Sequence, residues 1–160
     1  MNARTSSGAV AIEFALVGLV FMSLLLMAME TAWQLVIDSA LGAGVRAASR
    51  FGSTGTTVAA GITPPPPDRN TSIEDVLIQN SGGLLRADRI QIVEASYASF
   101  AALAGGGAST PGPGAASQAV QYTVTYTQPY LTPIATAITG QTQLIHHVHV
   151  VVLNEPFPSN

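Results

Sequence analysis

Three histidines near the carboxyl end of the chain are residues whose type could bind a metal. His146, His147 and His149 lie in TQLIHHVHVVVL (142–153), a stretch predicted to be a strand because it is rich in β-branched residues. On a strand, His147 and His149 share one face and His146 points away, so two imidazoles could form half of a metal site. The chain has no cysteine, and the nearest following acid, Glu155, is six residues beyond His149. A polar outer face of a strand explains the pair, and we predict no bound metal.

Two other patterns fall short of a catalytic or phosphate-binding site. The glycine-rich stretch GGGASTPGPG (105–114) lacks the Lys-Ser/Thr pair and the following helix of a phosphate loop. Glu74 and Asp75 are adjacent, and neighbours on a helix diverge by about 100°, so they do not form an acid/base pair. No serine lies in a nucleophile-elbow pattern. We therefore predict that the protein is not an enzyme and uses no cofactor or small-molecule substrate.

Charged residues are scarce throughout the chain. Only 9% of the 160 residues are charged, against about 25% in typical domains, and the net charge is −3. All six basic residues are arginines, and no basic cluster or block of like charge is present. This composition predicts that nucleic acid is not a partner.

Gly8 and Glu13 have a spacing that calls for a functional reason. Glu13 is the one charged residue in an apolar run over residues 9–29, where a deeply placed carboxylate costs about 2.5–3.5 kcal/mol. Gly8 lies at the polar–apolar boundary, and its lack of a Cβ lets a protease approach the backbone closely. A cut after Gly8 would give Ala9 an α-amino group about one helical turn from Glu13, and pairing would offset the cost of the carboxylate. The alternative is a glutamate that extends to the membrane interface at a helix end.

The element that must position these residues is a long amino-terminal helix. Residues 9–29 would span about 32 Å as a helix, close to the roughly 30 Å hydrocarbon core of a bilayer. Arg4 precedes this run and Glu30 and Asp38 follow it, so the positive-inside rule predicts a cytoplasmic amino terminus. A cleaved secretory signal is the alternative, but it fits poorly because MAMETAWQ is a weak cleavage site.

Beyond the apolar run, the helix is predicted to continue to about Phe51. Apolar and small residues recur there in alternating steps of four and three, which marks one helix face. Small residues in the middle of this face let another element approach the backbone closely. The predicted packing face consists of Trp33, Ile37, Ala40, Gly44, Ala47 and Phe51.

The second half of the chain predicts a small domain. Capping-box patterns at Thr71 with Glu74, or Ser72 with Asp75, predict a short helix over 73–80 that is closed by the glycines at 82–83. Strands are predicted over 89–97, 118–128 and 142–153 as an antiparallel meander, with a short helix over 131–138.

The predicted fold class is therefore α+β, with a long amino-terminal helix packed on a small antiparallel sheet. Its first half spans a membrane. The predicted organisation is a leader over 1–8, a transmembrane helix over 9–29, a soluble continuation of that helix over 30–52, a Gly/Thr/Pro linker over 53–70 and an α+β domain over 71–160 on the far side of the membrane from the cytoplasm.

The motif GAVAIEF (8–14) resembles the amino terminus of type IV pilin-class proteins, in which a short leader ends in Gly and Glu is the fifth mature residue. Four segments narrow the resemblance to the TadE-like pseudopilins of the tight adherence (Tad/Flp) family: AIEFALV (11–17), SALGAGVRAASRFG (39–52), YTVTYTQPYLTPI (122–134) and VVLNEPF (151–157). The chain departs from the family pattern in its single leader arginine, in Gly18 and Leu19 where relatives often have Pro, and in lacking a Glu near Arg46.

The resemblance implies a pilin-like fold and a minor pseudopilin that takes part in assembly of Tad/Flp-type pili and in cell adhesion. Prepilin peptidase would cut between Gly8 and Ala9, and Glu13, followed by Phe14, would pair with the new amine. The chain would cross the bacterial inner membrane once, with its carboxyl-terminal domain in the periplasm. Its partners would be other pilins, pseudopilins and the pilus assembly platform. The alternative is an uncleaved, membrane-anchored periplasmic binding or adhesion module, which keeps Met1.

Overall fold

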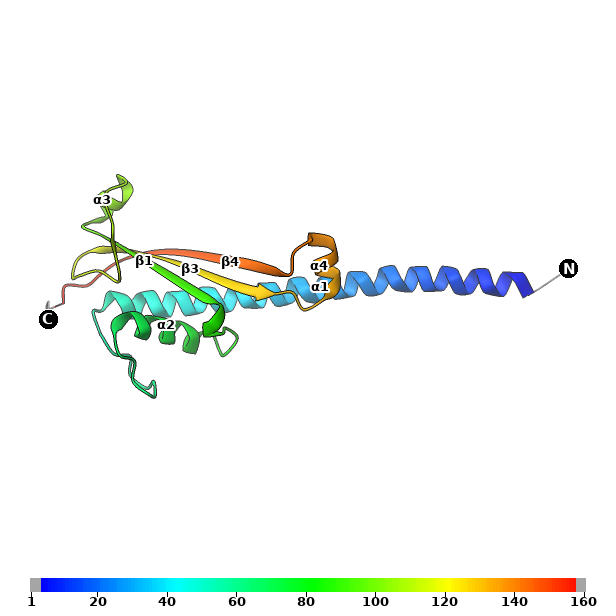
Figure 1. The fold of residues 1–160 in the computed structure, drawn as a ribbon, viewed down its shortest axis with the longest axis horizontal. Coiled ribbons are helices and arrows are strands. Elements are labelled where there is room, and N and C mark those ends of the chain that lie inside the picture. Colours follow the sequence, from blue (N-terminus) through cyan, green and yellow to red (C-terminus); the bar gives the residue numbers. More distant parts are fainter. Residues whose placement is uncertain (1–3, 158–160) are drawn as a thin grey trace. The chain divides into compact units, whose positions relative to one another are not determined.

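A single long helix begins the protein. The computed structural model describes residues 4–157, with side chains from Gly8 onward, and α1 runs from Arg4 to Ser53 (Figure 1). The helix contains no proline and is rich in Ala, Leu and Met, which favour helix. The predicted helix from residue 9 to about Phe51 is confirmed. It begins earlier than predicted, so residues 4–8 of the predicted leader are helical, and residues 1–3 of that leader lie outside the described residues.

The chain forms two compact units, each described here by itself. One contains the residues up to Leu35 together with Pro129–Leu144, and the other contains Val36–Gln128 together with the residues from Ile145 onward. The first unit includes α4 (Pro133–Thr139), which the sequence predicted as a short helix. Thr132 caps its start and Pro133 occupies the first turn, while Gly140, with φ of 71°, closes its end in the left-handed region.

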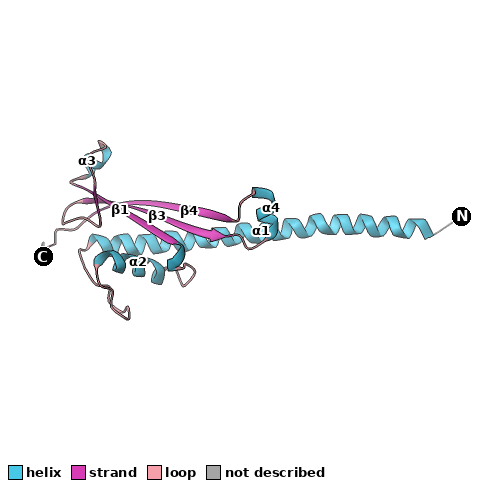
Figure 2. Cartoon of the chain, in the orientation of Figure 1, coloured by secondary structure: helices cyan, strands magenta, loops and turns pink. Residues whose placement is uncertain are grey.

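The second unit is built on a four-stranded antiparallel sheet with strand order β2-β1-β3-β4 (Figure 2). Strands β1, β3 and β4 confirm the three predicted strands to within one or two residues. A fourth strand was missed, because β2 is only two residues long and lies in a Gly/Pro-rich loop, where alternation gives no signal. The elements after α1 that belong to this unit or end in it are α2 (Arg69–Asn80), η1 (Ala87–Arg89), β1 (Ile90–Tyr97), α3 (Phe100–Ala104), β2 (Thr110–Pro111), β3 (Ala119–Pro129) and β4 (Gln143–Leu153).

The core of this unit lies between the sheet and the second half of α1, with α2 beside that helix (Figure 1). The predicted alternation of β3 is confirmed, because Tyr122, Val124 and Tyr126 are buried while the intervening threonines are partly exposed. Ile37 and Leu41 of α1 are completely buried. The other large buried apolar side chains are Val45, Ile73, Leu77, Leu85 and Val120.

The cap of α2 differs from the sequence prediction. Asp68, rather than Thr71 or Ser72, is the N-cap, and its Oδ1 accepts a hydrogen bond from the Thr71 backbone N–H at 2.8 Å. This bond holds the pKa of Asp68 below its ordinary value. Ser72 lies buried inside the helix, where its hydroxyl donates to the Thr57 carbonyl at 2.9 Å. Ser81, rather than the glycine pair that follows it, is the C-cap.

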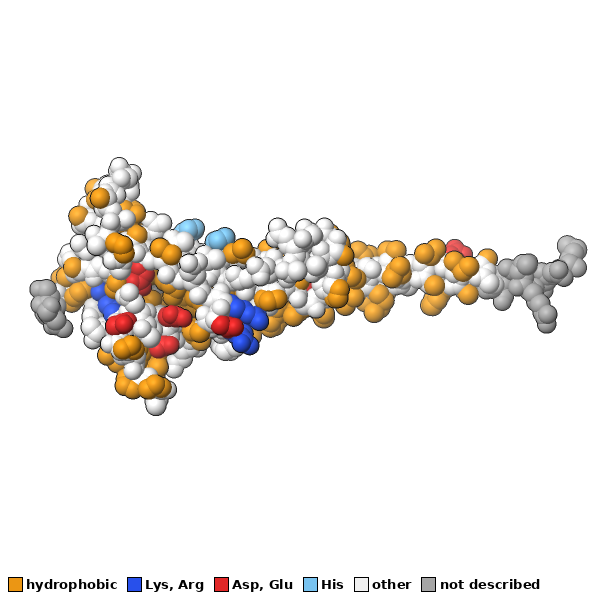
Figure 3. All heavy atoms as spheres, in the orientation of Figure 1, with side chains coloured by type: hydrophobic (Ala, Val, Ile, Leu, Met, Phe, Trp, Pro, Cys, Tyr) orange, Lys and Arg blue, Asp and Glu red, His pale blue; other side chains and the backbone are white. Residues whose placement is uncertain are grey.

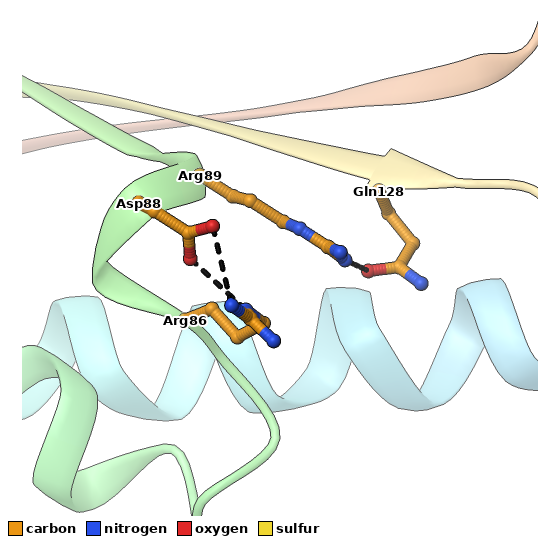
Figure 4. A network of polar contacts seen from close by, with 4 residues as sticks. All are labelled: Arg86, Asp88, Arg89 and Gln128. Carbon is orange, nitrogen blue, oxygen red and sulfur yellow. Dashed lines mark hydrogen bonds and ion pairs between the residues drawn. The ribbon is translucent and has the colours of Figure 1, made fainter.

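A polar contact joins the start of β1 to the end of β3 (Figure 4). Arg89 Nη1 donates to Gln128 Oε1 at 3.5 Å, and Gln128 is buried. Next to it, Arg86 Nε and Asp88 Oδ1 form an exposed ion pair at 3.0 Å. Because exposed ion pairs contribute little to stability, the buried amide of Gln128 is the more important group for aligning these strand ends.

Candidate functional site

Most side chains that the amino-terminal part of α1 exposes are apolar (Figure 3). The most apolar 18-residue window in the helix has a mean hydropathy of 2.5, and none of that window is buried. Phe14, Leu16 and Leu19 are each at least 60% exposed. The helix is long and apolar enough to cross a membrane, which is the environment that would cover such a surface.

The polar side chains in and next to this run are compatible with a bilayer. Ser23 Oγ donates to the Leu19 carbonyl at 2.8 Å, and Thr31 Oγ1 donates to the Met27 carbonyl at 2.9 Å. Because each hydroxyl donates to a carbonyl of the preceding turn, neither presents an unsatisfied donor to lipid. An unsatisfied donor there would cost several kcal/mol.

The four residues of the predicted cleavage and pairing motif lie at the start of this surface. Gly8, Ala9, Glu13 and Phe14 are all exposed on α1. A Cβ placed on Gly8 would meet no atom within 4 Å, so no other described element packs against this position of the helix. The Glu13 carboxylate makes no hydrogen bond or ion pair with another described residue. Since residues four apart on a helix face the same side, Ala9 and Glu13 lie one turn apart on one face.

A second glutamate, Glu30, lies at the end of the apolar run and is buried. Its Oε2 accepts hydrogen bonds from the Leu131 N–H at 2.9 Å, the Thr132 N–H at 3.0 Å and the Thr132 hydroxyl at 3.2 Å. Its Oε1 accepts from Gln34 Nε2 at 2.8 Å. Four donors therefore compensate the loss of water around this carboxylate. The arrangement ties α1 to the turn that begins α4.

Sequence reasoning noted Glu30 only as a charge beyond the apolar run and assigned it no contact. Two local signals were available: Glu30 and Gln34 are spaced i, i+4 on the helix, and Thr132-Pro133 is a helix-start pattern with free N–H groups. Neither signal could predict that Glu30 contacts Leu131 and Thr132, which are about a hundred positions away in the sequence.

The predicted packing face divides between covered and partly exposed positions. Ile37, Ala40 and Gly44 are buried, whereas Trp33, Ala47 and Phe51 are partly exposed. The covered surface also includes residues outside the predicted face, because both the sheet and α2 lie against this part of the helix (Figure 2). These additional buried residues are Leu41, Val45, Ala48, Ser49 and Gly52.

At Gly44, α2 lies very close to the α1 backbone. A Cβ built on Gly44 would lie 2.6 Å from the Leu77 carbonyl oxygen and 3.2 Å from the Leu77 Cγ. Real Cβ atoms do not approach a carbonyl oxygen this closely, so a glycine is required for the two helices to pack as they do.

The histidines lie on both faces of β4. His147 and His149 are exposed, and their Nδ1 atoms lie 3.2 Å from Thr125 Oγ1 and 3.1 Å from Thr123 Oγ1. His146 is buried on the opposite face, with its Nδ1 3.4 Å from Asp38 Oδ1 on α1. Within residues 4–157, no group of three or more potential ligands is placed to hold a metal ion.

Arg69 anchors the carboxyl-terminal segment to the end of α1. Its guanidinium donates to the carbonyl of Gly52 and, at 2.8 Å, to the carbonyl of Gly114, and it lies 5.2 Å from the ring centroid of Phe157. Burial lowers the pKa of Arg69. Glu155 adds a backbone hydrogen bond, from its N–H to the Ser53 carbonyl at 2.8 Å.

Two acidic groups near Arg69 have perturbed pKa values. Burial raises the pKa of the Glu94 carboxyl, and it raises the pKa of the Tyr122 phenol to about 12, while Arg69 opposes both shifts. Tyr122 Oη has no hydrogen-bond partner among the described residues. Glu94 and Glu74 also line a shallow pocket of about 390 Å³.

Comparison with known proteins identifies one segment of the chain. A family model described as TadE-like protein matches residues 8–50, which contain Gly8, Glu13 and nearly all of α1. No curated protein and no solved structure gives a significant match. The matched segment includes the apolar part of α1, which is long and apolar enough to cross a membrane.

Proposed function

Because the chain is TadE-like over residues 8–50, we propose that it is a minor pseudopilin of a Tad/Flp-type pilus, processed by prepilin peptidase after Gly8. The protein is then a structural subunit, not an enzyme. It is anchored in the bacterial inner membrane by residues 9–29, with its remaining part in the periplasm, and it associates with other pilins, pseudopilins and the assembly platform.

The observation that carries this proposal is the coincidence of the family match with the exposed apolar helix. The matched segment begins at Gly8 and includes the complete apolar run. The rest of the chain buries none of the most apolar 18-residue window of this helix. A helix left bare in this way needs lipid in the membrane and neighbouring helices in an assembly. Both environments are those of a pilin-like subunit before and after it is assembled.

Glu13 would act after the leader is removed. The cut turns the amide of Ala9 into a primary amine that is protonated at neutral pH, since α-amino groups have pKa values near 8. The Glu13 carboxylate then has a cationic partner one helical turn away in its own chain, or at the same level in a neighbouring chain. Pairing lowers the cost of holding Glu13 at the membrane and fixes the relative height of two packed helices.

The experiment is an intact-mass measurement on the full-length protein extracted from membranes, with and without co-expressed prepilin peptidase. The expected result is loss of residues 1–8 only when the peptidase is present. Gly8→Leu should block the cut, because a branched side chain prevents close approach to the bond. Gly18→Leu is the matched control and should be processed normally, because Gly18 also lies on the open helix surface with nothing within 4 Å of its Cβ position.

The role of Glu13 is tested separately, by co-purification with the other pilin-class subunits. Glu13→Gln should be processed yet recover less of these subunits, whereas Glu13→Asp, which keeps the charge, should recover more of them than Glu13→Gln. Residues 1–8 retained in the presence of active peptidase would contradict the proposal and favour the uncleaved binding module. Equal recovery with Glu13→Gln would remove the pairing role alone.

A further inference from the structure

We propose that Pro129–Leu144, called the α4 segment below, lies in the headgroup region of the bilayer and sets the depth of α1. The proposal rests on the membrane-spanning role given to residues 9–29. Its ligand is a lipid surface, and the segment that would contact it belongs to the same compact unit as the apolar half of α1.

Glu30 fixes where the α4 segment lies along the helix. Three of the four hydrogen bonds to its carboxylate come from Leu131 and Thr132, at 2.9–3.2 Å. Side chains on an α-helix lean toward its amino terminus, so the Glu30 carboxylate lies over the turn that precedes it. That turn is the last turn of the apolar run. The start of α4 is therefore held at the level where a bilayer-spanning helix leaves the hydrocarbon.

The composition of the α4 segment suits this level. Among its sixteen positions, PYLTPIATAITGQTQL, there is no Asp, Glu, Lys, Arg or His. Its exposed apolar side chains include Leu131, which is 50% exposed, and Ile138, which is 67% exposed. Tyr130 is partly exposed, as is Trp33 on α1, and both residue types are enriched at membrane interfaces.

Several polar groups of the segment are hydrogen-bonded within the chain. Thr132 caps α4, Thr139 Oγ1 donates to the Ala135 carbonyl at 2.8 Å, and the Tyr130 N–H donates to the Thr142 carbonyl at 3.1 Å. A capped turn with bonded hydroxyls can enter the headgroup region at low desolvation cost. Exposed apolar side chains and a complete lack of charge are not expected together in a loop that faces only water, and the α4 segment has both.

The test uses single-cysteine variants of the full chain, which is possible because the protein has no cysteine of its own. Leu131→Cys and Ile138→Cys are labelled with a polarity-sensitive fluorophore and reconstituted into phosphatidylethanolamine/phosphatidylglycerol vesicles. Quenching is measured with aqueous iodide and with a phospholipid that carries a nitroxide near its headgroup. Leu16→Cys reports on the anchor, and Arg50→Cys is the aqueous control, about 30 Å beyond the apolar run on the same helix.

Both α4 labels should show blue-shifted emission, loss of most of the iodide quenching seen at Arg50→Cys, and strong quenching by the headgroup nitroxide. The proposal is overturned if either α4 label is as accessible to iodide as the label at Arg50→Cys while Leu16→Cys is shielded, a result that leaves the membrane anchor intact. Iodide shielding without nitroxide quenching would indicate a protein contact and also overturns it. An iodide-accessible Leu16→Cys would overturn the anchor as well. Proteolysis patterns matching the cysteine-free parent check that each variant is folded.

Discussion

Two glutamates on α1 carry the same charge in opposite surroundings. Glu13 is exposed and its carboxylate has no hydrogen bond or ion pair with another described residue, whereas Glu30 is 3% exposed and its carboxylate accepts four hydrogen bonds. Glu30 is therefore explained by the fold of the single chain. The described contacts of the single chain give no such explanation for Glu13.

Replacing Glu30 should destabilise the protein. Glu30→Gln puts an amide N–H₂ against groups that are themselves donors, and lost hydrogen bonds to a charged group cost about 1.5–3 kcal/mol. In a chain of this size the melting temperature in detergent should fall by roughly 3–12 °C. Glu13→Gln is the matched control and should leave it unchanged. Equal melting temperatures for the two variants would show that the Glu30 contacts are not formed.

Tyr122 gives a prediction about alkaline pH. Burial raises its pKa to about 12, above the ordinary value of 10, so the folded state favours the neutral phenol. The resulting stability is fully present below pH 10 and is lost as the pH rises toward 12, which amounts to about 2–3 kcal/mol. Denaturant titrations at pH 8 and pH 11 should show about half of this loss in the wild type, because pH 11 lies midway between the two pKa values.

The same titrations on Tyr122→Phe supply the control. The phenol oxygen has no hydrogen-bond partner among the described residues, so its removal should change stability little at pH 8. At pH 11, Tyr122→Phe should lose less stability than the wild type. A parallel decline in both proteins would assign the alkaline effect to other groups.

At the level of elements, the small-residue stretch of α1 allows the close approach of α2. Local patterns predicted the long helix, three strands and a short helix near residue 133, because each has its own periodicity or cap. The start of α2 was misplaced by a few residues, because Asp68, Thr71 and Ser72 are all good caps locally. Only tertiary contacts place Ser72 inside the helix, where it bonds the Thr57 carbonyl.

Adding one methyl group to this helix contact should be costly. Gly44→Ala places its Cβ 2.6 Å from the Leu77 carbonyl oxygen, which belongs to the backbone of α2, so the unfolding free energy should fall by about 1–3 kcal/mol. Gly42→Ala is the matched control. Its Cβ meets only the flexible end of Arg46, at 3.3 Å, so helix propensity should raise stability by up to about 1 kcal/mol. The contact is refuted if denaturant titration shows the two variants to be equally stable.

At the level of the whole molecule, the distribution of charge predicts one orientation in the membrane. Arg4 and the amino terminus should stay in the cytoplasm, because positive charge flanking a span favours that side. Arg50→Cys, on the part of α1 beyond the span, should then react with a membrane-impermeant maleimide added to spheroplasts. Labelling that appears only after the membrane is permeabilised would reverse the orientation.

The sequence by itself determined the features that depend on neighbours along the chain. Residues 9–29 are recognisable as a span by length and hydropathy, the alternation of β3 identifies its buried face, and GAVAIEF gives the motif that the family match also covers. These features can be recognised without knowledge of the fold, because each is a property of a short, continuous segment.

Only the tertiary structure decided which distant groups meet. It shows that the Glu30 carboxylate accepts hydrogen bonds from Leu131 and Thr132, and that Gly44 packs against Leu77. It also shows that Arg69 contacts Gly114 and Phe157. A carboxylate, a glycine or an arginine has no periodic signal that names its partner, because the partner is chosen by how elements pack and which polar groups that packing removes from water. The hydrogen bonds between Glu30 and the start of α4 are the clearest result of that packing.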